Sequence, residues 1–198
     1  GINPVRYFMI REVPFGSDGD FSYPMLAHRT NTELANDLGN LVQRVLSFVH
    51  KNAEAKIPQH TEFTSEDQEI LQKSYHLIDD LRNYANQQQL HKLCEGIWSL
   101  VSAANRYVDY QKPWDLRKTD TARMSTVLYT LLEVIRVIGL YLQPIIPQSA
   151  AKILDLLMVP QDSRTFACIS QSLVAGVCLE RKPEPIFPKI EMTNVKMD

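Results

Sequence analysis

Two polar side chains four residues apart could form a recognition edge for a flat ligand. Asn40 and Arg44 lie in a segment whose apolar residues recur at helical spacing, which predicts a helix. At a spacing of four they are neighbours on that helix, at the border of its apolar stripe. An amide beside a guanidinium offers an acceptor and several donors to the edge of a nucleobase. The alternative is that Arg44 covers the core with its aliphatic stem and Asn40 is an ordinary surface residue.

The two tryptophans have different surroundings, which suggests different roles. Trp114 follows Pro113, which ends the preceding helix because proline lacks an N–H and clashes with the turn before it. A tryptophan at such a corner can be a structural plug or an exposed platform on which an unpaired base stacks. Trp98 lies in the middle of an expected helix, so we predict that it belongs to the core.

Residues for catalysis or metal binding form no recognisable pattern. The sequence contains no HxxxH pair, no Cys/His quartet, no Walker loop, no GxGxxG and no GxSxG. Cys94 falls on the inner face of an expected helix, which favours a core role over a nucleophile. Asp79 and Asp80 point about 100° apart on a helix, as expected of a solvated face. We therefore predict no catalytic residues and no metal site in this chain.

The composition favours long helices and excludes several classes of protein. Only 7 of the 198 residues are Gly, whereas apolar residues make up 44% and charged residues 22%, which suits a sizeable core. The net charge of −2 excludes a polycation that binds nucleic acid through phosphates alone. The three Cys include no CxxC pair, which favours a reducing compartment, the cytoplasm or an organelle matrix. The apolar segment 127–142 contains Glu133 and Arg136, so we expect a buried helix and no membrane span.

Capping residues, prolines and apolar spacing predict an all-α fold, an antiparallel helix bundle. Ser22 is placed to cap the first long helix, and Thr64 or Ser65 the second, with Asp67 or Gln68 completing a capping box. Pro14 is expected to end a short helix at the N-terminus and to open a glycine-containing loop. The expected helices cover about 5–12, 23–51, 65 to the Gln87–Gln89 turn, 90 to Pro113, 121–142 and 148–157.

The chain divides into three parts on these grounds. Residues 1–22 form the end of another module and a linker, 23–160 the helical domain, and 161–198 an appendage that packs back on the bundle. Within the appendage, 172–179 and 186–191 are expected to be short strands. Because the chain begins with Gly1 and not Met, and at once enters what resembles the start of a helix, we interpret it as part of a longer protein.

Several of these segments resemble the C-terminal part of the methionyl-tRNA synthetase family. The segment from His28 to Arg44 is similar to the first helix of the anticodon-binding domain of that family. Asn105-Arg106-Tyr107 followed by Pro113-Trp114 resembles its NxYxxxxxPW motif. Further similar segments are Val5 to Phe8, Arg11-Glu12, Phe15 to Ser22, Leu128 to Pro147 and Pro185 to Pro188.

The resemblance implies a class I synthetase that uses ATP, with Mg, to activate methionine and attaches it to tRNA(Met). The family's catalytic signatures, HIGH and KMSKS, lie before the matched region, and this chain contains neither. Arg123-Met124-Ser125 is only superficially similar to KMS, since it falls inside the expected helix 121–142. The chain alone is therefore expected not to catalyse methionylation, and its partners would be the tRNA(Met) anticodon loop and the upstream catalytic domain of the same enzyme.

The resemblance also implies which residues read the anticodon. In the family, the residues matching Asn40, Arg44 and Trp114 contact the anticodon CAU, particularly its first base, cytosine. Trp114 would stack on the cytosine, Arg44 would donate to its O2 and N3, and the Asn40 carbonyl would accept from its N4 amino group. A uracil presents a carbonyl in place of that amino group and should be rejected.

Two other functions remain possible at this point. The bundle could be a helical protein-interaction module that never touches RNA, or a freestanding RNA-binding domain without ligase activity. Binding to a CAU stem-loop would separate the first of these from the anticodon reader. The presence of a HIGH-bearing domain upstream would separate the second.

Overall fold

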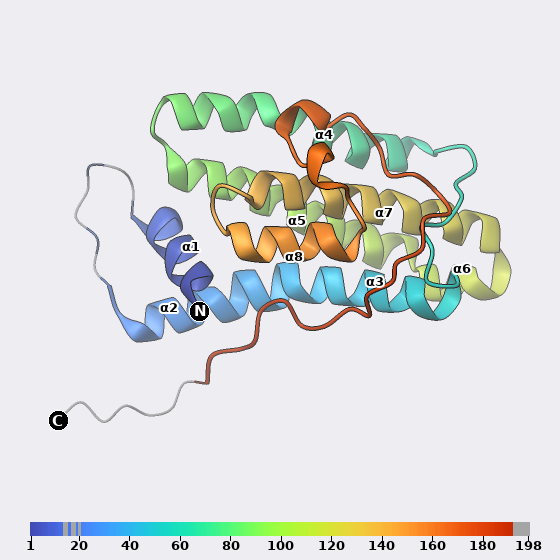
Figure 1. Cartoon of the computed structure of the whole chain (residues 1–198), viewed down its shortest axis with the longest axis horizontal. Helices are drawn as coiled ribbons and strands as arrows, with labels where there is room; N and C mark the ends of the chain where they lie inside the picture. Colours follow the sequence, from blue (N-terminus) through green and yellow to red (C-terminus); the bar gives the residue numbers. More distant parts are fainter. Residues whose placement is uncertain (14–15, 17–18, 20, 192–198) are drawn as a thin grey trace.

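Long helices make up most of the computed structural model, which describes residues 1–13, 16, 19 and 21–191. Pro14 and most of the loop expected after it lie outside these residues. The helices are α1 Ile2–Glu12, α2 Tyr23–Arg29, α3 Asn40–Asn52, α4 Ser65–Asn86, α5 Leu90–Gln111, α6 Pro113–Thr119, α7 Thr121–Leu142 and α8 Pro147–Leu156. The long helices α3, α4, α5 and α7 pack side by side along the long axis of the molecule, and α1 lies at an angle to them (Figure 1). A π-helical segment, η1 Thr30–Gly39, joins α2 to α3, and the short 3₁₀ turns η2 Gln161–Ser163 and η3 Phe166–Cys168 follow α8.

The bundle is built around α7, whose bounds agree with the prediction. This helix packs against α3, α4, α5, α6 and α8. It is long and apolar enough to cross a membrane by length and composition, but 94% of its most apolar window is buried inside the bundle. Contact with helices on several sides explains an apolar sequence without a polar face. The expectation of a core helix is therefore confirmed.

The side-chain caps predicted from the sequence are present at the starts of α2 and α4. The N–H of Met25 donates to the Ser22 hydroxyl at 3.3 Å, at the start of α2. Thr64 and Asp67 form the expected capping box of α4, in which the Thr64 N–H donates to Asp67 Oδ2 at 3.0 Å. Each cap satisfies a backbone donor that would otherwise lack a partner at the helix start.

The first long helix is continuous but not uniformly α-helical. The expected α-helix over 23–51 contains the ten-residue π segment η1 in its middle. Gly39 lies at the end of this segment, where an added Cβ would come within 3.1 Å of the Leu34 carbonyl oxygen. The expected stripe still faces the core, since Leu34 and Leu38 are fully buried. The widened turn therefore changes the hydrogen bonding of this helix without exposing its apolar face.

Two expectations about connections were wrong. The first follows from ending one expected helix at Pro113 and beginning the next at 121, with a loop through Lys118 to Asp120 before it. The structure instead has the short helix α6 there. Proline is favoured in the first turn of a helix, so Pro113 both ends α5 and begins α6.

The second error concerns the short C-terminal strands, which are absent from the described part of the chain up to residue 191. In the segment 172–179 there is only an isolated antiparallel bridge between Lys56 and Cys178. Gly176, at φ +87°, turns the chain there, and its N–H donates to the Ile57 carbonyl at 2.8 Å. In the segment 186–191, the side chain of Asn31 takes the place of a partner strand, since it donates to and accepts from the backbone of Ile190.

A buried ion pair holds the C-terminal segment against α7. The Glu133 carboxylate accepts from Arg136 Nη2 at 2.6 Å and from the backbone N–H of Leu173 at 3.0 Å. Arg136 also donates to the carbonyl of Ile169 at 2.6 Å. Both charged side chains are almost completely buried, and they bind the appendage through its backbone groups. The appendage therefore packs back on the bundle through specific polar contacts as well as apolar ones.

Candidate nucleic-acid interface

A shallow groove lies between η1, α3 and α5, and both Asn40 and Arg44 open onto it. Its volume is about 500 Å³, and it is lined by Asn36, Asn40, Gln43, Arg44, Ser47, Asn105 and Asp109. Asn40 and Arg44 are exposed, in the first and second turns of α3. All seven lining side chains can donate or accept hydrogen bonds, so the groove suits a ligand with polar edges.

Arg44 is oriented by side chains across the groove. Its Nη1 donates to Asp109 Oδ1 at 2.8 Å, and its Nη2 donates to Asn105 Oδ1 at 3.3 Å. The side chain remains 39% exposed, and a guanidinium has five N–H groups in total. Arg44 therefore reaches from α3 to α5, with N–H groups to spare for a ligand, and does not simply cover the core.

Asn105 is in turn held by backbone carbonyls on both sides of the groove. Its Nδ2 donates to Asp37 O at 3.1 Å, in the π segment, and to Val101 O at 3.2 Å, in its own helix. These two bonds leave its carbonyl oxygen facing Arg44. Sequence reasoning did not identify Asn105 and Asp109 as partners of Arg44. Their own spacing of four residues on one helix, complementary to Asn40 and Arg44, is the signal that could have found them.

Trp114 lies on the next helix and outside the lining of this groove. It is the second residue of α6 and is 37% exposed, whereas Pro113 before it is buried. Arg117, on the same short helix, donates to Asn52 Oδ1 at 3.0 Å and so ties α6 to the end of α3. The structure thus brings Asn40 and Arg44 together on one groove. Trp114 follows Asp109, the partner of Arg44, by five residues and lies on the neighbouring helix α6.

The residues around Trp114 carry a small excess of positive charge, four basic side chains against the three exposed aspartates Asp109, Asp115 and Asp120. Four basic side chains are exposed toward the end of α5 and on α6, namely Arg106, Lys112, Arg117 and Lys118. Tyr110, on α5 four residues before Trp114, is the most exposed aromatic residue of this region at 72%. Cations beside exposed aromatic rings are the combination that single-stranded nucleic acid requires.

Trp98 has the opposite environment, as predicted. It is 6% exposed and packs against Tyr7 with the ring centroids 4.5 Å apart. Its indole N–H has no hydrogen-bond partner among the residues that the structure describes. Trp98 is therefore a core residue that joins α5 to α1.

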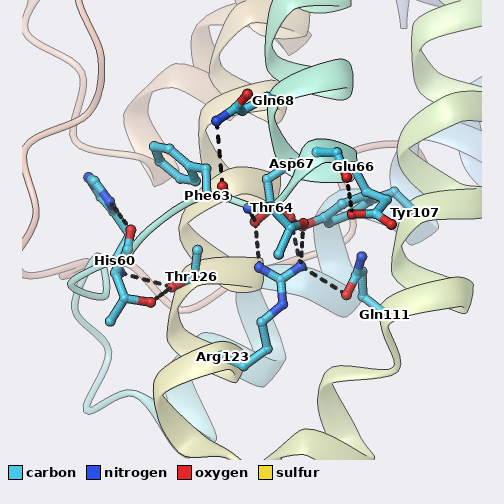
Figure 2. Close-up of polar contacts among 12 residues, drawn as sticks. His60, Phe63, Thr64, Glu66, Asp67, Gln68, Tyr107, Gln111, Arg123 and Thr126 are labelled. Carbon is cyan, nitrogen blue, oxygen red and sulfur yellow. Dashed lines mark hydrogen bonds and ion pairs between the residues drawn. The ribbon is translucent and has the colours of Figure 1, made fainter.

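Directly next to α6, one buried carboxylate connects three helices (Figure 2). Asp67, in the first turn of α4, is completely buried and accepts from Arg123 Nη2 at 2.7 Å. It also accepts from the hydroxyl of Tyr107, on α5. The hydrogen bonds from Arg123 and Tyr107 outweigh the effect of burial and hold the pKa of Asp67 below its usual value. Burial and the adjacent carboxylate raise the pKa of the Tyr107 hydroxyl.

Cys94 lies in the core and the Asp79–Asp80 pair on a solvated face, where the sequence predicted them. Cys94 is buried in the core, which raises the pKa of its thiol to about 12 and makes it a poor nucleophile. Asp79 and Asp80 lie toward solvent on α4. In the described residues, no three His, Cys, Asp or Glu side chains lie close enough together to hold a metal ion.

Comparisons with known proteins match this chain in two parts, with Trp114 in one and Asn40 and Arg44 in the other. A family model described as the anticodon binding domain of methionyl tRNA ligase matches residues 57–197, and one described as tRNA synthetases class I (M) matches residues 2–46. The methionine–tRNA ligase of Brucella suis biovar 1 is 48% identical over 96% of this chain, and that of Mycobacterium leprae is 42% identical over 99%. The chain spans 37% of the length of each of these relatives.

Solved structures agree with the sequence comparisons. The apo form of Mycobacterium tuberculosis methionyl-tRNA synthetase superposes with a TM-score of 0.93 at 42% identity, over 96% of this chain and 39% of that one. A second structure of that synthetase, bound by methionyl-adenylate, superposes with a TM-score of 0.92 over 95% of this chain and 38% of that one. The all-α fold and the family expected from the residues are both confirmed, and the chain belongs to the methionyl-tRNA ligase family, of which it matches the anticodon-binding part.

Proposed function

We propose that the end of the bundle formed by α3, α5 and α6 reads the CAU anticodon of tRNA(Met). The observation that carries this proposal is the placement of Asn40 and Arg44, both exposed, on one polar groove. Anticodon bases are unpaired and can be splayed out, so they can be read on their edges by such side chains. The methionyl-tRNA ligase family membership supplies the class of nucleic acid.

The first anticodon base, cytosine, is the proposed occupant of the groove. The free N–H groups of Arg44 donate to O2 and N3 of the base, and the carbonyl of Asn40 accepts from its N4 amino group. Trp114 offers an exposed ring on which the base stacks. The basic residues around α6 contact the neighbouring phosphates, which position the loop without reading its sequence.

Methionylation itself is assigned to a catalytic domain upstream in the same enzyme. That domain would bind ATP, with Mg, and methionine, and this chain would supply no cofactor ligand. Such an enzyme works where its tRNA is used in translation, in the cytoplasm or in an organelle matrix.

An apolar face at the other end of the molecule suits the catalytic domain as a partner. Ile2, Val5 and Met9 lie on one face of α1 and are 60%, 40% and 50% exposed. Phe21 and Tyr23, at the start of α2, are exposed by 54% and 46%. Apolar side chains gathered in this way mark a surface for another protein module, and the class I synthetase model matches this same region.

The proposal is tested by titrating the full chain with two anticodon stem-loops that differ only in the first base. We expect the CAU stem-loop to bind about 5- to 150-fold more tightly than the UAU stem-loop. The reason is that protein contacts to the edge of the wrong base typically cost about 1–3 kcal/mol of binding free energy. Arg44→Ala should weaken binding of the CAU stem-loop. Arg82→Ala is the matched control, since Arg82 is an exposed arginine on α4 whose ion pair, with Asp79, is at 3.6 Å.

Equal affinities for the two stem-loops would contradict the proposed reading of the first base. Failure to bind either stem-loop would favour a helical protein-interaction module. Equal losses in Arg44→Ala and Arg82→Ala would mean that binding depends on overall charge and not on the groove.

A further inference from the structure

The corner that presents Trp114 contains an unfavourable backbone conformation. Lys112, between the last residue of α5 and Pro113, has φ 46° and ψ 64°, in the left-handed region. A residue with a Cβ is uncommon in this region, and it stays there only when its surroundings fix the chain on both sides. Contacts from the rest of the fold must therefore fix the end of α5 and the start of α7, the two helices that α6 connects.

The Asp67 cluster, defined as Asp67, Tyr107, Gln111 and Arg123, holds both of these ends. Arg123, in the first turn of α7, donates to both carboxylate oxygens of Asp67 and also to Gln111 Oε1 at 3.0 Å. Gln111 is the last residue of α5, directly before Lys112. Arg123 therefore bridges the residue before the corner to the helix after it, with Asp67 as a buried anchor (Figure 2).

The geometry requires an arginine at position 123. A guanidinium is a flat fork that can place two N–H groups on one carboxylate while another reaches a second acceptor, whereas an ammonium group is a single point. Tyr107 fixes the carboxylate from the α5 side, and the Thr64 N–H fixes it from the start of α4 at 3.0 Å. Each member of the cluster is held by at least one other, so a single arrangement is favoured.

We propose that Asp67, Tyr107 and Arg123 are positioning residues that set the place of Trp114 for stacking on an anticodon base. This inference rests on the proposed function, since it assigns a role to Trp114 in binding RNA. None of the three residues lines the groove of Asn40 and Arg44. They affect binding by fixing the backbone at Lys112 and Pro113, and they do not contact the groove directly.

The experiment uses Arg123→Lys in the full chain, because lysine keeps the charge beside Asp67 but loses the fork that reaches Gln111. Trp98→Phe is made first, so that Trp114 is the sole tryptophan of the two in the sequence and reports its own surroundings by fluorescence. Phenylalanine is suitable at position 98, since the Trp98 N–H has no partner among the described residues. We expect Arg123→Lys to shift the emission of Trp114 and to weaken CAU stem-loop binding about three- to tenfold.

A double-mutant cycle shows whether this loss acts through Trp114. In a Trp114→Ala background, Arg123→Lys should cause no further loss of affinity. Tyr107→Phe removes one hydroxyl and should shift fluorescence and affinity in the same direction, which keeps the test valid if Arg123→Lys does not fold. Arg164→Lys is the matched control, because Arg164 pairs with Asp155 at 2.7 Å, outside the Asp67 cluster, and should leave both readouts unchanged.

The outcomes distinguish failure of this inference from failure of the proposed function. Two results would overturn the positioning role if the unmodified chain still bound the stem-loop. One is unchanged Trp114 fluorescence in folded Arg123→Lys and Tyr107→Phe. The other is a loss of affinity in these variants that adds to the loss in Trp114→Ala. If the unmodified chain did not bind the stem-loop, the proposed function would fail, and with it the role of the Asp67 cluster in RNA binding.

Discussion

The two ends of the molecule expose different chemistry. In one region, α3, α5 and α6 present a polar groove, an arginine held across it, and charged side chains of both signs near the partly exposed Trp114. On the opposite side of the molecule from α6 lie α1 and α2 (Figure 1). These helices expose apolar side chains such as Ile2 and Met9. Polar side chains fixed by hydrogen bonds suit the recognition of bases in an RNA loop. An apolar face suits a permanent contact with another protein module. The long helices set the separation between these two surfaces.

The two tryptophans provide the strongest test of this comparison, since one is structural and the other is exposed. Trp98→Ala removes a buried ring that packs on Tyr7 of α1. We expect it to lower the free energy of unfolding by about 3–5 kcal/mol, as measured by urea denaturation. A change of less than a few tenths of a kcal/mol would show that the core does not depend on this contact.

Acid should destabilise the bundle through Asp67, next to the RNA-reading end. The pKa of Asp67 is lower in the folded chain than its ordinary value of about 3.9. Its contribution to stability is therefore complete above that value and is lost as the pH falls through the lower, folded pKa. Asp67→Asn should make the free energy of unfolding less dependent on pH below about 4. Identical pH profiles for the two proteins would contradict a stabilising role of the charged form.

Trp114→Ala should affect binding and leave stability nearly unchanged. We expect the affinity for the CAU stem-loop to fall by about 1–3 kcal/mol, the usual contribution of one stacked base. Circular dichroism should show unchanged helicity, because the ring is 37% exposed and Pro113 beside it provides the buried contact. If Trp114→Ala lowered stability and Trp98→Ala lowered binding, the structural and the RNA-binding tryptophan would be the other way round.

The smallest effect is expected at the apolar end. Met9→Asp places a charge on the exposed face of α1 and should change the free energy of unfolding by less than about 0.5 kcal/mol. Stem-loop affinity should also stay the same. In the full-length enzyme, the same substitution should weaken docking of the catalytic domain, detected as increased proteolysis between the two parts. Unaltered proteolysis would exclude Met9 from the interface.

Local signals in the sequence were sufficient for most of the fold. Helix positions could be predicted from signals that act over a few residues. These signals are the helical periodicity, the Ser22 cap, the Thr64–Asp67 capping box and prolines such as Pro113. The π segment could not, because the spacing of apolar residues does not report which carbonyl each backbone N–H bonds. The strands expected after residue 172 failed because alternating apolar residues do not supply a partner strand.

The site was predictable only in part, for a similar reason. Asn40 and Arg44 lie four residues apart on one helix, so their common face follows from spacing alone. The contact of Arg44 with Asp109 joins residues 65 positions apart, and that of Asp67 with Arg123 joins residues 56 positions apart. Contacts of this kind depend on how the helices pack, which spacing along one helix does not encode.

The ratio of the affinities for the CAU and UAU stem-loops, measured in the unmodified chain and in Asn40→Ala, tests the central claim most directly. The Asn40 carbonyl is the group proposed to recognise the amino group of cytosine, and Asn40 is exposed on the groove. We predict that the ratio is about 5 to 150 in the unmodified chain and falls toward one in Asn40→Ala, mainly through weaker binding of CAU. A ratio that is the same in both proteins would contradict the reading of the first anticodon base by this groove.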